Sequence, residues 1–226
     1  MRSSSKTSLL FLACLLGVSL FCSAEGQAEP YVAAEGGYVV TNNLTNVQGK
    51  GLNTGINFSE LTVKDTYMYG ARAGYIFADP KEGGFGFEFE VYNTYPTVDQ
   101  QITVRSAGGP LQINGNRLRV TTMALNVTGR TPRFGRFQPY GGVGPGVFFA
   151  RDSSPVGTHS FGRNATLGLN GFAGLRLFVT DRVSLFGEYK YNLVKLHFEN
   201  FFGTTESGAR FTYSADILTG GLAFHF

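Results

Sequence analysis

Apolar and polar side chains alternate at every second position along most of this chain, which is the pattern of β-strands rather than of helices. In the segment 183–196, for example, Glu188 and Lys190 fall on one face while Tyr189 and Tyr191 fall on the other. The same alternation predicts eight strands, at 31–40, 66–77, 84–94, 117–129, 137–149, 166–178, 183–196 and 213–226. Each is long enough to cross a bilayer at a tilt, which takes about 9 to 11 residues.

The connections between these strands alternate strictly between long and short, with 25, 6, 22, 7, 16, 4 and 16 residues. The short ones carry turn-forming residues, such as Asp79-Pro80, Thr131-Pro132 and Thr180-Asp181. An outer-membrane barrel has this asymmetry because its periplasmic turns are tight and its external loops are free to grow. A soluble sandwich or a lipocalin-like carrier has no reason for it. The sequence therefore predicts an all-β fold, an eight-stranded antiparallel up-and-down transmembrane β-barrel.

The polar face of the strands is rich in glycine, which separates a membrane barrel from a soluble sandwich that would also alternate. A solvated sheet face is normally dense in Lys, Thr and Ser, whereas the interior of a small barrel must alternate small and large side chains. The glycines of this face are Gly70, Gly74, Gly86, Gly142, Gly144, Gly146, Gly168, Gly174 and Gly221. Aromatic residues near strand ends are expected to form interfacial girdles. They are Tyr67, Tyr75, Phe77, Phe148, Phe149, Phe178, Phe224 and Phe226.

Composition supports this fold class. Charged residues make up 15 %, and the chain contains 31 Gly, 21 Phe and 11 Tyr but no Trp, which excludes a disordered chain, a coiled coil and a helix bundle. The formal net charge is +3, and because Arg2 and Lys6 belong to the N-terminal leader, no basic surface for nucleic acid is expected.

The N-terminus has the pattern of a cleaved signal peptide, predicted over 1–24, with the barrel domain over 25–226. Basic residues precede an apolar run at 9–21 that is too short to span a membrane as a helix. Cleavage is expected after Ala24, with Ala28 as a second candidate. Both cysteines, Cys14 and Cys22, lie in this leader, so no disulfide, zinc site or cysteine catalysis is expected.

Three motifs resemble the small outer-membrane β-barrels of Gram-negative bacteria, the outer membrane protein A-like and opacity-type family often called the porin family. The first is the glycine-rich run 139–146, and the second is the acidic-aromatic-basic run 187–191. The third is the terminal spacing of Thr219, Gly221, Phe224 and Phe226. This terminal motif resembles the signal that the barrel-assembly machinery reads.

The resemblance implies insertion in the cell outer membrane with the help of periplasmic chaperones, and contact with outer-membrane lipid and lipopolysaccharide. Pro145 departs from the family's strand and predicts a bulge or a break, because proline cannot donate to the ladder. Since no sequence follows Phe226, the peptidoglycan-binding domain of larger members is not expected.

No catalytic constellation emerges, and no metal or other cofactor is expected. Some small barrels modify lipid A with a His, a Ser and an acid, which makes His159-Ser160 and His197 with Glu199 candidates. Neither group has a third residue at a fixed spacing that would complete such a catalytic set. We therefore interpret these residues as solvated loop residues. His225 is expected to line the periplasmic mouth of the barrel.

Seven charged residues are expected to point into the lumen by the strand phase, four acids against three bases. They are Glu35, Arg72, Glu88, Glu90, Arg176, Glu188 and Lys190. Single charges buried in a narrow lumen cost several kcal/mol each, so pairing is expected, although the pairs themselves stay open. We favour a structural plug over an ion path, because side chains just fill an eight-stranded barrel.

The four long connections, taken as 43–65, 95–116, 151–165 and 197–212, are expected to carry the function of the protein. Their apolar residues Ile56, Phe58, Phe201 and Phe202 suggest contact surfaces for a ligand. The preferred function is a non-enzymatic structural or surface-interaction role, such as envelope integrity, adhesion or shielding. A narrow solute or ion channel is the alternative, and a lipid A-modifying enzyme is a remote third.

Overall fold

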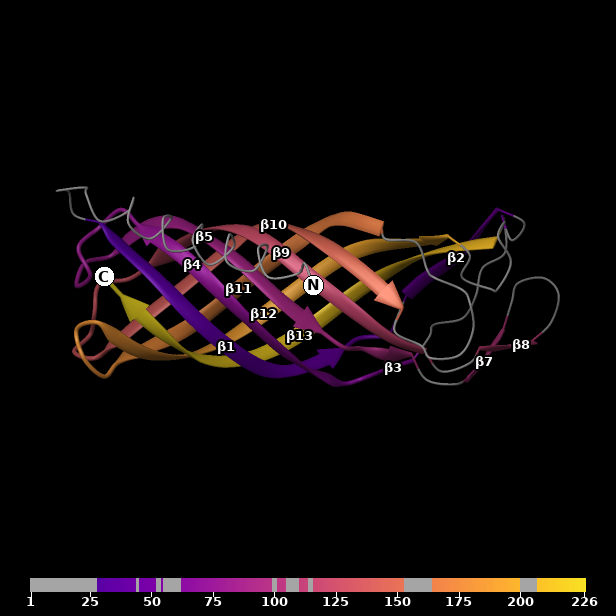
Figure 1. The fold of residues 1–226 in the computed structure, drawn as a ribbon, viewed down its shortest axis with the longest axis horizontal. Coiled ribbons are helices and arrows are strands. Elements are labelled where there is room, and N and C mark those ends of the chain that lie inside the picture. Colours follow the sequence, from indigo (N-terminus) through magenta and orange to yellow (C-terminus); the bar gives the residue numbers. More distant parts are fainter. Residues whose placement is uncertain are drawn as a thin grey trace, which may run out of the picture.

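Eight long β-strands close into one barrel in the computed structural model of this chain (Figure 1). The structure describes residues 28–43, 45–51, 54, 62–98, 101–104, 110–113, 116–152, 164–199 and 207–226. The barrel strands are β1 (Glu29–Thr41), β4 (Thr66–Ile76), β5 (Gly84–Thr94), β9 (Asn116–Arg130), β10 (Phe137–Asp152), β11 (Asn164–Phe178), β12 (Val183–Glu199) and β13 (Ser207–His225). Each pairs antiparallel with the next, and β1 with β13 closes the ring. The predicted fold class is confirmed. Within these ranges no helix is long and apolar enough to cross a membrane.

The predicted long connections contain strands that the sequence analysis missed. They are β2 (Thr45–Gly51), β3 (Val63–Lys64), β6 (Thr97–Val98), β7 (Gln101–Val104) and β8 (Pro110–Ile113). β2 pairs with β13, and β6 pairs with both β3 and β9, so the sheet continues past the predicted strand ends. β13 accordingly begins at Ser207 rather than at 213. β2 was missed because Thr, Gln and Gly hide its period-two pattern, and β3 and β6 because two residues are too few to show a period.

The short connections confirm their predicted turn chemistry. The Asp79 carboxylate accepts a hydrogen bond of 2.9 Å from the Lys81 backbone N–H. The Thr180 hydroxyl accepts hydrogen bonds from the N–H groups of Arg182 and Val183, at 3.2 and 3.0 Å. In the turn between β9 and β10, Gly135 has a φ of 64°, a conformation that glycine adopts without a steric penalty. All three turns lie at one end of the barrel, which the long-short asymmetry predicts to be periplasmic.

Proline at position 145 does not produce the predicted bulge. The register between β10 and β9 is the same on both sides of it, with Val143 opposite Val127 and Gly146 opposite Ala124. Only the pairs at Gly144 and Pro145 are missing on that side, while both residues stay paired with β11. The missing N–H therefore interrupts the ladder locally without adding a residue to the strand.

Large apolar side chains cover the outside of the barrel in a belt, as a lipid-facing surface requires. On β5, Phe85, Phe87 and Phe89 are each at least half exposed. Two residues predicted to join the outer girdles are exceptions. Phe148 and Phe178 have exposed fractions of 0 % and 4 % and lie inside the barrel. Both residues fall on the inward phase of their strands. Closeness to a strand end therefore did not predict which side of the sheet they face.

The inward glycines make room for aromatic rings on the neighbouring strand. Tyr31 lies directly opposite Gly74, and Phe172 lies opposite Gly142. A Cβ added at Gly142 would come within 2.6 Å of the Phe172 ring. Three more cross-strand pairs follow the same pattern, Gly70 with Tyr92, Gly174 with Tyr140 and Gly221 with Phe186. The predicted alternation of small and large residues in the lumen is therefore realised between strands.

Candidate functional site

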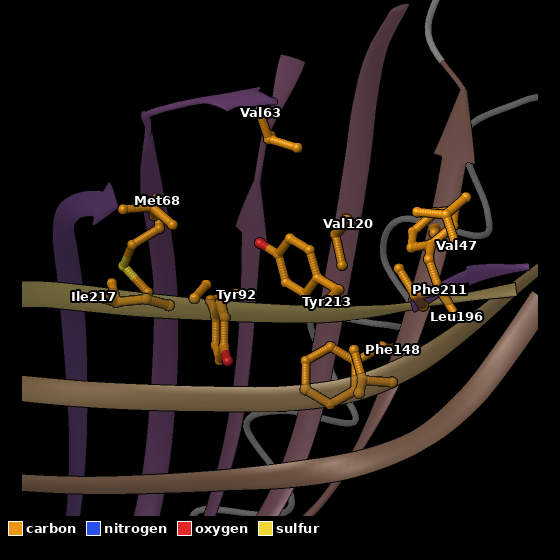
Figure 2. Packing of buried hydrophobic residues seen from close by; sticks show 14 residues of the cluster. Val47, Val63, Met68, Tyr92, Val120, Phe148, Leu196, Phe211, Tyr213 and Ile217 are labelled. Atoms are coloured by element: carbon orange, nitrogen blue, oxygen red, sulfur yellow. The ribbon is translucent and has the colours of Figure 1, made fainter. Parts of the chain in front are cut away.

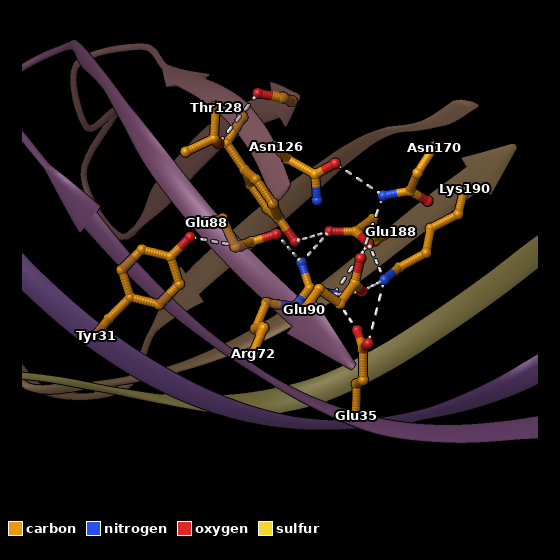
Figure 3. A network of polar contacts seen from close by, with 12 residues as sticks. Tyr31, Glu35, Arg72, Glu88, Glu90, Asn126, Thr128, Asn170, Glu188 and Lys190 are labelled. Carbon is orange, nitrogen blue, oxygen red and sulfur yellow. Dashed lines mark hydrogen bonds and ion pairs between the residues drawn. The ribbon is translucent and has the colours of Figure 1, made fainter. Parts of the chain in front are cut away.

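Arg72 on β4 is the centre of a buried charge network in the middle of the lumen (Figure 3). Its guanidinium donates two hydrogen bonds to the Glu188 carboxylate across the barrel, at 2.8 and 3.0 Å. It also pairs with Glu35, and it lies 3.4 Å from Glu88 and 3.8 Å from Glu90. The side chain of Arg72 is 1 % exposed and those of Glu35, Glu88 and Glu90 are fully buried, so these charges depend on one another rather than on water.

Lys190 is the second cation of the network. Its ammonium lies 3.1 Å from Glu35 and 3.4 Å from Glu188, and it also contacts Glu90. Oxygen atoms of these three glutamates lie within 4.8 Å of one another, close enough to share a metal ion. The ammonium already provides a positive charge among them, so the arrangement is complete without a metal.

Arg176 differs from the expected role, because the structure shows no ion pair between it and a carboxylate in the described chain. Instead, its guanidinium lies between two aromatic rings, 4.5 Å from the Tyr31 centroid and 4.3 Å from the Tyr140 centroid. Such a stack stabilises a desolvated guanidinium by about 2 kcal/mol. The other six predicted lumen charges do come together.

Uncharged residues that the sequence analysis did not select complete the network. Tyr140 donates a hydrogen bond of 2.8 Å to Glu188, and Tyr31 donates one to Glu88. Asn170 donates to Glu90 at 3.3 Å and to Asn126 at 3.0 Å. All of these residues fall on the inward phase of their strands, which was the available sequence signal. The network thus links carboxylates on β1, β5 and β12 through donors on other strands.

A second polar group, here called the mouth cluster, closes the end of the lumen beneath the short turns. It consists of Glu29, Arg130, Ser184 and His225, all buried. Glu29 contacts both Arg130 and His225, and the other ring nitrogen of His225 lies 2.8 Å from the Ser184 hydroxyl. Arg130 also donates to the carbonyl of Asp79 at 2.8 Å, which ties the cluster to a turn. The predicted place of His225 at this mouth is confirmed.

The mouth cluster has the Ser-His-acid order of a hydrolase triad. Ser184 and His225 are 0 % and 1 % exposed, however, so a substrate carbonyl has no access to the hydroxyl. A cavity of about 290 Å³ lies outside the cluster and is lined by Lys81, Arg133 and His225, among others, but not by Ser184. This geometry fits a structural hydrogen-bond relay better than a nucleophile.

The lumen beyond the charge network, toward the long connections, holds a cluster of buried apolar side chains (Figure 2). Its side chains come from nearly every barrel strand, and Met68, Phe148 and Ile217 are at most 2 % exposed. Tyr92 forms the boundary, because its ring packs with this cluster while its hydroxyl accepts a 2.6 Å hydrogen bond from Asn192. Within the described chain the lumen is therefore filled from the mouth cluster to this apolar layer.

The remaining predicted residues are placed as follows. Phe224 and Phe226 point outward, their rings 5.1 Å apart, whereas Thr219 faces the lumen and Gly221 lies beneath the Phe186 ring. His197 and Glu199 fall at the end of β12. The residues outside the described ranges include His159, Ser160, Ile56, Phe58, Phe201 and Phe202, together with the whole predicted signal peptide.

Comparison with known proteins places this architecture in a family. The model of the outer membrane protein beta-barrel domain matches residues 11–226. The structure is similar to the outer membrane protein OprG from Pseudomonas aeruginosa, with a TM-score of 0.59, 14 % identity and coverage of 89 % of this chain and 97 % of that one. It is also similar to Neisserial surface protein A, with a TM-score of 0.53, 15 % identity and coverage of 87 % and 97 %. No curated protein sequence matches the chain. The family match extends over almost the entire sequence, and the chain belongs to the outer membrane β-barrel domain family.

Proposed function

We propose that this protein is a closed outer-membrane barrel with a structural or surface-interaction role, which presents its long connections outside the cell and conducts no solutes at rest. The observation that carries the proposal is the charge network around Arg72, which ties four strands together across the lumen. Side chains just fill an eight-stranded barrel, and among the described residues the network lies between the apolar layer on one side and the buried mouth cluster on the other.

The alternative is a narrow ion or solute channel, and bilayer conductance distinguishes the two. We expect the unmodified protein to show little or rare conductance in planar bilayers. Glu188→Ala removes the bidentate partner of Arg72 and leaves an unpaired cation in the lumen, so it should open a leak or unfold the barrel. Glu188→Gln, which keeps the shape and one acceptor, is the matched control. Steady, large openings by the unmodified protein would replace our proposal with the channel.

The arrangement of the mouth cluster is the reason to test for an enzyme. Because Ser184 is fully buried, we expect no reaction with a serine-directed fluorophosphonate and no ester hydrolysis. Stoichiometric labelling that Ser184→Ala abolishes would contradict the non-enzymatic role. Lipid A recovered from cells with and without the protein should have the same mass, which tests the lipid A-modifying alternative separately.

We also propose that the terminal motif serves assembly. Phe224 and Phe226 point outward on the last strand, where assembly machinery could read them before the barrel closes. Replacing both by Ala should leave export intact but slow insertion, measured by the rate at which the heat-modifiable form appears on gels. Insertion at the normal rate would show that the match to the family's terminal motif is coincidental.

A further inference from the structure

Two arginines interrupt the apolar outer surface at the end of the barrel that bears the long connections. Arg117 and Arg119 on β9 point outward and are exposed. They lie next to three outward tyrosines, and we call the five residues the Arg–Tyr cluster. Its tyrosines are Tyr67 and Tyr69 on β4 and Tyr95, which follows β5.

Contacts within the Arg–Tyr cluster hold the guanidinium groups in place. Both guanidinium groups lie over the Tyr95 ring. That of Arg117 is 5.5 Å and that of Arg119 is 5.8 Å from the ring centroid. Arg117 donates to the Tyr67 hydroxyl at 3.4 Å, and Arg119 donates to the Asn93 side chain at 3.1 Å. The hydroxyls of Tyr69 and Tyr95 lie 2.7 Å apart.

The charge of this cluster is not compensated within the described chain. Neither arginine forms an ion pair with a carboxylate among the side chains that the structure describes. Asp65, the acid nearest to Tyr67 in sequence, instead accepts hydrogen bonds from the Tyr38 hydroxyl and the Thr41 N–H, on the side of β1. Two fixed positive charges therefore face outward beside neutral hydroxyl donors, which is the chemistry that recognises a phosphate.

The height of the cluster on the barrel identifies the source of that phosphate. The outward apolar residues of β5 run from Phe85 to Val91, and Asn93 is the first polar one. From Phe85 to Asn93, at about 3.4 Å per residue and a tilt of about 40°, the strand rises roughly 21 Å, close to the apolar belt of about 25 Å that such barrels have. The pairs of Asn93 with Thr121 and of Thr97 with Arg117 place both arginines just above that belt.

We propose that the Arg–Tyr cluster binds a phosphate group of lipid A, the phosphorylated glycolipid of the outer leaflet. The proposal rests on the outer-membrane location of the barrel but not on its closed lumen, so the two can fail independently. The Tyr67 hydroxyl supports it, because it accepts the hydrogen bond from Arg117 and so keeps its own proton to donate to the phosphate.

The test compares lipid A binding by the refolded full-length barrel and by Arg117→Gln/Arg119→Gln in neutral detergent. Bisphosphorylated lipid A should bind about thirty-fold more weakly to the double variant. The control Lys81→Gln/Arg182→Gln removes two charges from exposed residues at the opposite end and should bind as the unmodified protein does. Unchanged affinity in the double variant, or an equal loss in the control, would overturn the proposal.

Binding measurements with other ligands distinguish lipid A from other sources of phosphate. Dephosphorylated lipid A should bind to the unmodified protein as weakly as intact lipid A binds to the double variant. Phosphatidylglycerol and inorganic phosphate should not compete at the concentration of lipid A that saturates the site. Equal binding of dephosphorylated lipid A would contradict phosphate recognition, and effective competition by either of the other two would contradict the assignment of lipid A. The heat-modifiable gel shift of each variant shows that it is folded before binding is measured.

Discussion

The two halves of the lumen solve the same packing problem by different means. Toward the short turns, the interior is held by the charge network and the mouth cluster, in which Arg72 alone contacts carboxylates from three other strands. Toward the long connections, it is held by apolar side chains such as Phe148, Phe211 and Ile217. Charge pairs are geometrically exacting and costly when broken, whereas apolar packing tolerates changes of shape that conserve volume. The polar half should therefore be much more sensitive to substitution.

The largest effect is expected for Arg72→Ala. It removes the ion pairs of Arg72 with three buried carboxylates and leaves Lys190 as the cation beside Glu35 and Glu188, so the free energy of unfolding should fall by about 3–5 kcal/mol. Urea unfolding of the refolded protein in detergent measures this free energy. Tyrosine fluorescence, which no tryptophan obscures, and the gel shift follow the unfolding. Arg72→Lys keeps the charge and should recover part of the loss. A change below about 1 kcal/mol for Arg72→Ala would mean that water enters the network and screens it.

A smaller loss is expected where glycine admits an aromatic ring. In Gly142→Ala the new methyl group would meet the Phe172 ring and the Val127 carbonyl, at 2.6 and 2.8 Å. Forced movement of this kind costs about 1–3 kcal/mol. The control is Gly187→Ala on the outer face, where no atom lies within 4 Å of the added Cβ. Equal stabilities of the two variants would show that the ring moves freely, and that the glycine–aromatic pairs do not determine the packing.

The apolar half is tested by Phe148→Leu, which removes volume without introducing polarity. We expect a loss of roughly 1 kcal/mol in the free energy of unfolding, because neighbours such as Val120 and Leu196 can close part of the space. The variant should remain closed in bilayers. A loss as large as that of Arg72→Ala would remove the contrast between the two halves.

Ser184→Ala is expected to have the smallest effect within the polar half. It deletes one hydrogen bond to His225, worth about 1 kcal/mol, while Glu29 and Arg130 remain paired. Thermal unfolding in detergent would report this as a small drop in Tm. A destabilisation comparable to that of Arg72→Ala would indicate that the mouth cluster, rather than the charge network, limits the stability of the polar half.

The sequence by itself determined the barrel, its eight strands and the side of the sheet on which the inward charges lie. These follow from local rules, since a period of two assigns each residue of a strand to one face, and turn chemistry marks the short connections. The same rules failed at Phe148 and Phe178, where nearness to a strand end was given more weight than phase. They also failed at β2, which carries little hydrophobic contrast, and at β3 and β6, which are only two residues long.

Only the tertiary structure decided which charges meet. Arg72 and Glu188 are 116 residues apart, on strands that β1 and β13 separate, and their contact depends on the stagger of the strands between them. Arg176 shows the same limit of sequence analysis. Its strand phase predicted that the charge points inward, but not that its partners are two tyrosine rings from β1 and β10 rather than a carboxylate. The sequence records the face of each side chain locally, whereas the partner across the lumen is set by ring closure and register, which no single strand contains.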